Sequence, residues 1–240
     1  MIGYATINDG TGDINIVADD IEVKKSVNRK TEYGLTGSRN PAFSADMERS
    51  YEGSIKIKAY EDKSAFIKIM GLVLGASSTG SSPETATETQ VNTLPEFNLR
   101  YGIKELNTEY TVTGCVVKSA KMSVKKGAIV ELDISFVAKA KTSGSYNAPS
   151  LPSSWFSILP KDVNAALSGQ TLDIFEIDVN VDNDVEVNYP LKGSAEPDSI
   201  NVNKRKKSGK ISFKTTSAGV PNSLIEDNDG ADITISIGGD

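Results

Sequence analysis

Histidine and cysteine, two side chains that often catalyse reactions or bind metals, are nearly absent from this chain. Its 240 residues include no histidine and a single cysteine, Cys115. Serine–histidine and cysteine–histidine nucleophile pairs therefore cannot form, and neither can histidine-ligated or multi-thiolate metal sites. Carboxylates are numerous, but no spacing singles out a pair suited to glycosidase chemistry. We expect no catalytic residue, no metal and no cofactor, and therefore a protein that is not an enzyme.

Cys115 lies in the apolar run TGCVV, which favours a small buried hydrophobic residue over a reactive thiol. With one cysteine there is no internal disulfide, which fits assembly in a reducing cytoplasm. The first residues, MIGYATINDG, lack the basic and apolar segments of a secretory signal. No apolar run approaches the roughly 20 residues of a membrane-spanning helix, and we expect no membrane anchor.

Of three acidic segments, two could be mistaken for calcium sites. Residues 9–13 (DGTGD) and 227–230 (DNDG) resemble calcium-binding turns but lack the spacing to a distant bidentate glutamate. Tight turns between strands explain both segments. Asp178, Asp182 and Asp184 surround a predicted turn, and we interpret them as a solvent-exposed hairpin tip.

Residues 204–207 (KRKK), with Lys210, form the densest basic segment. Three interpretations remain open: a solvent-exposed face, a contact with an acidic face of another subunit, or a nucleic-acid contact. The net charge of −6 and the pI near 4.9 argue against tight binding to a phosphate backbone.

The elements that carry these residues are mostly predicted strands. Apolar and polar residues alternate along many segments, which is the period of a half-buried antiparallel sheet. In residues 128–140, for example, Val130, Leu132, Ile134 and Phe136 share the face that we expect to meet the core. The predicted strands are residues 13–19, 21–27, 54–60, 96–103, 109–117, 120–126, 128–140, 172–181, 185–193, 210–216 and 232–239.

One helix and two connectors interrupt this pattern. Residues 62–74 place Phe66, Ile69, Met70 and Val73 at helical spacing and are followed by Gly75, a favourable residue after a helix. We expect this helix to pack across an edge or a face of the sheet. Residues 75–93 are polar and read as a long loop, and residues 141–155 read as a connector between domains. Residues 163–169 fit either a helical turn or a strand.

The chain also contains an internal repeat. Residues 33–58 align without a gap to residues 189–214, so that position 33 corresponds to position 189 and the offset is 156 throughout. A fainter third copy begins at Tyr110 and places Lys126 where the first copy has Arg49. Repetition of this length indicates duplicated supersecondary units. The repeat residues to which we assign a structural role are Tyr33, Gly37, Arg49 and Gly53, with their counterparts Tyr189, Gly193, Arg205 and Gly209.

The repeat predicts two related β domains, residues 1–145 and residues 146–240. Glycines that recur within strands usually mark a bulge, a bend or a close backbone approach, and the recurring arginines suggest a shared role such as pairing with a carboxylate. The second copy lacks anything equivalent to residues 105–140. We expect either that the chain is truncated or that strands from a neighbouring molecule complete the second domain by adding to its open edge.

The segments IEVKKSVNRKTEYGLTGSRNPAFSADMERSYEGSIKIKAYED and EYTVTGCVVKSAKMSVKKGAIVELDISFVAKA, separated by a short helix, resemble the tail tube proteins of tailed bacterial and archaeal viruses. The second copy, IDVNVDNDVEVNYPLKGSAEPDSINVNKRKKSGKISFK, resembles the later part of the two-domain members. The resemblance implies a mainly β fold, an internally duplicated antiparallel β-sandwich or barrel with one main α-helix.

The resemblance also implies a non-enzymatic virion protein, assembled in the host cytoplasm and located in the tail. Its partners would be copies of itself and other tail proteins. Six chains, or three chains whose two domains imitate six, would form each ring, and stacked rings would form a tube for genome delivery. DNA would pass through the lumen without specific binding, and residues 75–93 and an N-terminal arm, residues 1–20, would make ring-to-ring contacts.

Two other functions remain as alternatives. A β-sandwich attachment or binding module of a tail or cell surface would show an exposed aromatic cluster for sugar stacking. A hydrolytic tail enzyme would need an acidic pair, and the missing histidine disfavours it further.

Overall fold

The computed structural model of the protein describes residues 2–10, 12–16, 18–32, 43–58, 63–75, 78–79, 85–86, 94–149, 163–167, 170–171, 173–189, 194–214 and 233–237. Several predicted features lie outside these residues: Tyr33, Gly37 and Gly193 of the repeat, the acidic turn at 227–230, and most of the 75–93 loop.

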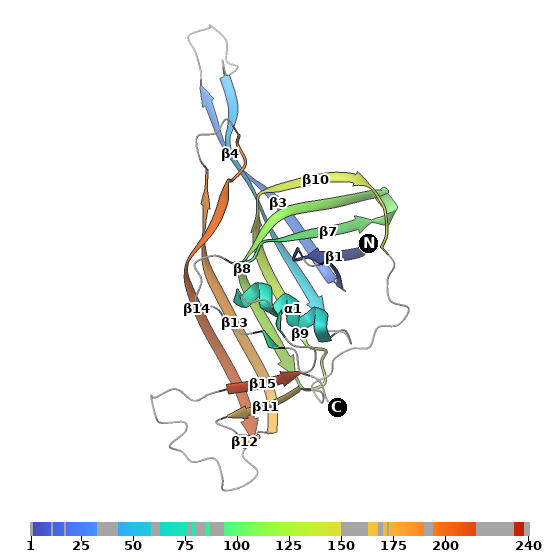
Figure 1. Ribbon diagram of the computed structural model, residues 1–240, viewed down its shortest axis with the longest axis vertical. Helices are drawn as coiled ribbons and strands as arrows, with labels where there is room; N and C mark the ends of the chain where they lie inside the picture. Colours follow the sequence, from blue (N-terminus) through green and yellow to red (C-terminus); the bar gives the residue numbers. More distant parts are fainter. Residues whose placement is uncertain are drawn as a thin grey trace.

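Strands account for most of the described chain, together with a single α-helix and one short 3₁₀ turn (Figure 1). The helix α1 spans Lys63–Leu74, and the 3₁₀ turn spans Lys104–Leu106. The strands of the main sheet system are β1 (Ile2–Asn8), β2 (Asp13–Ile16), β3 (Ala18–Glu32), β4 (Phe43–Lys58), β7 (Phe97–Ile103), β8 (Thr108–Lys125), β9 (Glu131–Ala138), β10 (Ala140–Ser145), β13 (Asp173–Asn188) and β14 (Ser199–Lys214). Two small sheets are formed by β5 (Ser78–Thr79) with β6 (Thr85–Ala86), and by β11 (Val163–Leu167) with β12 (Gln170–Thr171) and β15 (Ile233–Ile237).

The long strand β8 belongs to two sheets. Its first half pairs with β7 and β10, and its second half pairs with β9 and β13. The two halves meet near Gly114, which has φ = 63° and donates its N–H to Asn98 Oδ1 at 3.1 Å. Because most residues avoid this backbone conformation, glycine is favoured at the change of sheet. One sheet therefore has the order β2-β1-β7-β8-β10, and the other has the order β3-β4-β9-β8-β13-β14.

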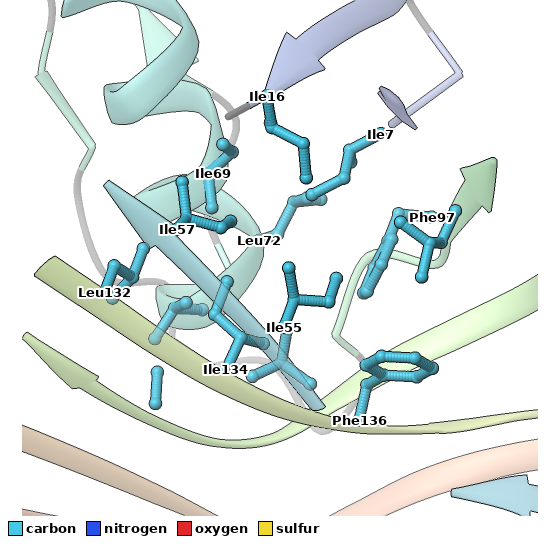
Figure 2. Close-up of a cluster of buried hydrophobic side chains, with 14 of the residues drawn as sticks. Ile7, Ile16, Ile55, Ile57, Ile69, Leu72, Phe97, Leu132, Ile134 and Phe136 are labelled. Atoms are coloured by element: carbon cyan, nitrogen blue, oxygen red, sulfur yellow. The ribbon is translucent and has the colours of Figure 1, made fainter. Parts of the chain in front are cut away.

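The main core lies between these two sheets and is covered by α1. Figure 2 shows Ile7 and Phe97 of the first sheet on one side and Ile55 and Ile134 of the second on the other. The predicted helical stripe is confirmed in its essentials, since Phe66, Ile69, Leu72 and Val73 are buried and Met70 is half-buried. The alternation of apolar residues in β9 likewise directs Leu132, Ile134 and Phe136 into the core, as predicted.

The internal duplication predicted from the sequence is present in the backbone. The offset of 156 maps β3 onto residues 174–188 of β13, and it maps β4 onto β14. Both hairpins contain two register shifts, between Ala18 and Asp20 and between Asn28 and Arg29 in the first. The shifts in the second hairpin occur at the corresponding positions. The two hairpins are therefore copies of one unit, and they flank the central pair β9 and β8 in a single sheet (Figure 1).

Several predicted elements were wrong in detail. Residues 2–8 are not part of an extended arm, because β1 pairs on both sides and Ile7 is fully buried. The strands predicted at 109–117 and 120–126 are one strand, β8, and residues 141–145, predicted as connector, belong to β10. For residues 163–169, where a helical turn and a strand were both open, the structure shows a strand at 163–167. The faint third copy is not a third hairpin, since Lys126 lies in the turn after β8 whereas Arg49 lies within β4.

Candidate assembly surface

The six-stranded sheet β3-β4-β9-β8-β13-β14 presents a polar face opposite its core face. Residues directly opposite one another in neighbouring strands share a face. One such row is Lys56, Asp133, Lys121, Asn180 and Ser208, and it crosses five strands. We call the outward residues of these rows the outer sheet face: Glu22, Lys24, Glu52, Ser54, Lys56, Glu131, Asp133, Ser135, Lys121, Ser123, Lys125, Glu176, Asp178, Asn180, Asp182, Asp184, Lys204, Lys206, Ser208 and Lys210.

Ion pairs and hydrogen bonds connect the strands across the outer sheet face. Glu176 forms ion pairs with Lys125 at 3.1 Å and with Lys210 at 3.6 Å, so one carboxylate of β13 contacts lysines of both neighbouring strands. This contact raises the pKa of Lys125, mainly through the hydrogen bond to Glu176. The pair Lys56–Glu131, at 3.1 Å, raises the pKa of Lys56 in the same way.

The two hairpins differ in how charge is distributed over their strands. In the first hairpin, both β3 and β4 carry acidic and basic residues. In the second hairpin, every charged residue of β13 is acidic and every charged residue of β14 is basic. The interpretation of Asp178, Asp182 and Asp184 as a hairpin tip is therefore wrong, since they lie along the middle of β13. Lys206 and Lys204 of β14 stand opposite Asp182 and Asp184 in the ladder, and their positive charge offsets the turn-forming tendency of this Asp-Asn-Asp sequence.

The basic segment at residues 204–207 and Lys210 lies on β14, an edge strand of the described sheet. Lys204, Lys206 and Lys210 stand opposite Asp184, Asp182 and Asp178 in the ladder. Within the described residues, β14 pairs with β13 alone and β3 pairs with β4 alone. The sheet therefore ends in two long edges, each presenting backbone groups to which another strand can add.

The repeat arginines hold different parts of the molecule together. Arg49 bonds to Glu196 at 2.6 Å, and its backbone N–H donates to the carbonyl of Ala195, so that β4 contacts the loop of the second hairpin. Arg205 donates to Asn183 Oδ1 at 2.8 Å and to the carbonyl of Leu74, at the C-terminal end of α1, at 2.9 Å. Equivalent positions thus have different partners, because different elements surround the two hairpins.

The repeat glycines also differ in their surroundings. A side chain at Gly53 would collide with the ring of Phe136 and would lie 2.6 Å from the carbonyl oxygen of Glu22. Among the described residues, a side chain at Gly209 would approach the carbonyl oxygen of Asp178 alone, at 3.1 Å, and Gly209 is exposed. Tyr189 follows β13 and is half-buried.

Among the described residues, no group of histidine, cysteine, aspartate and glutamate has a geometry suited to a metal ion. Of the segment 9–13, Asp9 and Gly10 follow β1 and Asp13 begins β2; Asn8 donates to Asp13 at 2.7 Å and accepts from the N–H of Gly10. Cys115 is fully buried, as its apolar surroundings predicted, and burial raises the pKa of its thiol. In the part of the chain that the structure describes, no helix has the length and apolar character required to span a bilayer.

The described surface does not contain the aromatic cluster that a sugar-binding module would use. Phe175 is the exposed aromatic residue among the large hydrophobic side chains of the described chain, and the ammonium of Lys126 lies 5.6 Å from its ring centre. Tyr101 is buried beside Tyr110, and burial raises its pKa to about 12.

Sequence reasoning did not identify the outer sheet face. Its signal was present in the polar positions that alternate with core residues, such as Glu131, Asp133 and Ser135 in β9. Their common surface becomes apparent only once the strand order and register are known.

The comparisons with known proteins agree with this architecture. No curated protein gives a significant sequence match. A family model described as phage tail tube protein matches residues 3–240, which is nearly the whole chain. The resemblance inferred from the sequence is thereby confirmed, and the chain belongs to the phage tail tube protein family.

Proposed function

We propose that this protein is a non-enzymatic building block that assembles into rings, and that the rings stack into a tail tube through which the viral genome passes. Family membership supports self-assembly into a tube and association with other tail proteins. The single observation that carries the finer proposal is a six-stranded sheet whose two edges are unpaired in the described chain, with one face packed on the main core and rows of polar residues on the other.

The strand directions permit a ring. All neighbouring pairs in the order β3-β4-β9-β8-β13-β14 are antiparallel, so β3 and β14 run in opposite directions. Copies placed around an axis can therefore continue the antiparallel alternation from β14 of one copy to β3 of the next. The antiparallel alternation also continues if two further antiparallel strands lie between β14 of one copy and β3 of the next. Closure into a barrel removes the exposed edges, which would otherwise promote aggregation.

The outer sheet face is the surface that we assign to the lumen. The opposite face of the sheet is covered by the core and α1, so the outer sheet face is the one available to line a channel. Its lysines alternate with carboxylates, and several of them are already engaged in ion pairs within the chain. A wall of this kind lacks the unbalanced cluster of lysine and arginine on which phosphate-backbone affinity depends. DNA would therefore pass without specific binding.

Two features of the assembly remain proposals. The ring contains either six chains, or three chains whose two duplicated domains, residues 1–145 and 146–240, imitate six. The second domain is then an incomplete copy of the first. Residues 75–93 are our candidate for ring-to-ring contacts. Residues 1–20 no longer suit that role as a whole, because β1 is part of the core.

Negative-stain electron microscopy of the purified full chain, with light scattering to count subunits, tests the proposal. We expect rings or tubes with a central hole of a few nanometres, and the subunit count distinguishes three from six. A monomer at every concentration would contradict self-assembly and favour the attachment module.

A further inference from the structure

The neighbours of Gly53 explain why this position of the repeat is a glycine. Residue 53 stands directly opposite Phe136 in the ladder between β4 and β9. The Phe136 ring occupies the space where a side chain of residue 53 would lie, and it packs edge-on against Phe97, with ring centres 5.9 Å apart. The glycine therefore makes room for an aromatic side chain from the strand added to the edge of β4.

Gly209 has the same place in the second hairpin but lacks such a neighbour in the described chain. It pairs with Val179 as Gly53 pairs with Val23, and the flanking register shifts are the same. Glycine within a strand weakens it unless another group approaches closely. In the first hairpin, β9 pairs with the edge of β4 that faces away from β3. No described strand pairs with the corresponding edge of β14.

The charges around this edge indicate the character of the missing strand. In the first hairpin, β9 directs Glu131 and Asp133 outward next to Lys56, and Glu131 forms an ion pair with that lysine. On β14 the outward residues near Gly209 include Lys206 and Lys210, both exposed. A strand with outward carboxylates would complement this edge, since opposite charges on neighbouring strands attract.

We propose that the edge of β14 at residues 208–214, along which no described strand lies, binds an antiparallel strand that resembles β9. This strand carries an aromatic side chain opposite Gly209 and acidic side chains on its outward face. The inference rests on the proposed function, because it is this edge that would join the sheet to the rest of the ring. It goes further in assigning Gly209 as a specificity-determining residue and in defining the chemistry of the strand that the edge accepts.

A peptide taken from the chain itself provides the probe. Residues 129–139 (IVELDISFVAK) cover β9, and the place of this strand on β4 is already filled within the folded chain. We expect a fluorescently labelled peptide of this sequence to bind the full chain, with binding measured by anisotropy at concentrations where light scattering detects single, unassembled chains. Hydrogen exchange should show new protection in residues 208–214. A peptide with alanine at the position of Phe136 should bind about tenfold more weakly or worse, as expected for a buried aromatic anchor.

Matched protein variants locate the contact. Gly209→Val should reduce binding at least as much as the alanine peptide does, whereas Ser208→Val should leave it unchanged, because Ser208 is also exposed but points to the other face. Unfolding of both variants in urea checks that they fold. An absence of binding to the unmodified chain, or equal binding by Gly209→Val, would overturn the inference.

The outcome separates this inference from the proposed function. Peptide binding that depends on Gly209, in a protein that never forms rings, would support the strand site and contradict the tube. Rings that form equally well with Gly209→Val would support the tube and contradict the strand site.

Discussion

The two hairpins share a backbone but not an environment. Hairpin β3–β4 and hairpin β13–β14 have the same pairing register and the same two bulges, yet their equivalent residues contact different groups. Gly53 lies under Phe136 while Gly209 is exposed, and Arg49 and Arg205 bind different partners. Duplication has thus preserved strand geometry, while the neighbours of each copy determine what its side chains do.

The charge pattern shows the same divergence. The first hairpin mixes both signs on each strand, whereas the second places its carboxylates on β13 and its lysines and arginine on β14. An acidic strand is stable inside the sheet because both of its neighbours supply lysines. A basic strand at the edge suits an acidic neighbour, which matches the strand that we infer for β14.

The largest expected difference between the hairpins concerns the two glycines. Gly53→Ala should lower the free energy of unfolding by about 2–3 kcal/mol, since the new methyl group would overlap Phe136 and the backbone of Glu22. Gly209→Ala should change it by no more than about 0.5 kcal/mol. Urea unfolding followed by circular dichroism provides the comparison. Equal losses of unfolding free energy in the two variants would show that Gly53 is no more crowded than Gly209.

The arginines come next. Arg205→Met should cost about 2 kcal/mol, because it removes donors from buried Asn183 and from the carbonyl of Leu74. Arg49→Met should cost less than about 1 kcal/mol, since its ion pair with Glu196 is partly exposed and screened by solvent. The same unfolding measurement applies, and a larger effect at Arg49 would reverse our ranking of the two contacts.

A smaller effect should follow from changing the charge pattern of the second hairpin. Lys204→Glu introduces the residue that the first hairpin has at the equivalent position, Glu48, but places it opposite Asp184. Repulsion between the two carboxylates should cost about 0.5 kcal/mol. Lys204→Gln is the control, and the difference between the variants should shrink at high salt. A difference that is independent of salt would point to a cause other than charge.

The smallest effects should appear in the dependence of stability on pH. In the first hairpin, the hydrogen bond from Arg29 lowers the pKa of Asp46 below 3.8. Its stabilisation is therefore present above pH 3.8 and is lost as the pH falls further. In the second hairpin, Glu176 raises the pKa of Lys125 above 10.5. That stabilisation is present below pH 10.5 and is lost as the pH rises through the folded-state pKa.

Two variants distinguish the loss of stability at acid pH from the loss at alkaline pH. Asp46→Asn should weaken the loss of stability at acid pH, and Glu176→Gln should weaken the loss of stability at alkaline pH. Urea midpoints recorded across the pH range at low salt measure both. An unchanged acid limb in Asp46→Asn, or an unchanged alkaline limb in Glu176→Gln, would contradict the assignment of these contacts.

The features that were predictable from the sequence are those carried by local patterns. The constant offset of the repeat predicted the duplication, helical spacing predicted α1, and alternation predicted the core residues of β9. The course of β8 was not predictable, because the bend at Gly114 depends on pairing with strands distant in sequence. The acidic strand β13 was misread for a similar reason, since Asp182 and Asp184 favour a turn unless lysines lie beside them. The outer sheet face required the complete strand order.

The central claim is that the outer sheet face lines the tube and α1 lies away from the channel. Electron cryomicroscopy of tubes assembled from the full chain tests it directly. We predict a map in which Lys121, Asp133 and Lys56 face the lumen, and in which the edges of β3 and β14 are paired within a continuous barrel. A map with α1 lining the channel, or with the outer sheet face buried between stacked rings, would contradict the account.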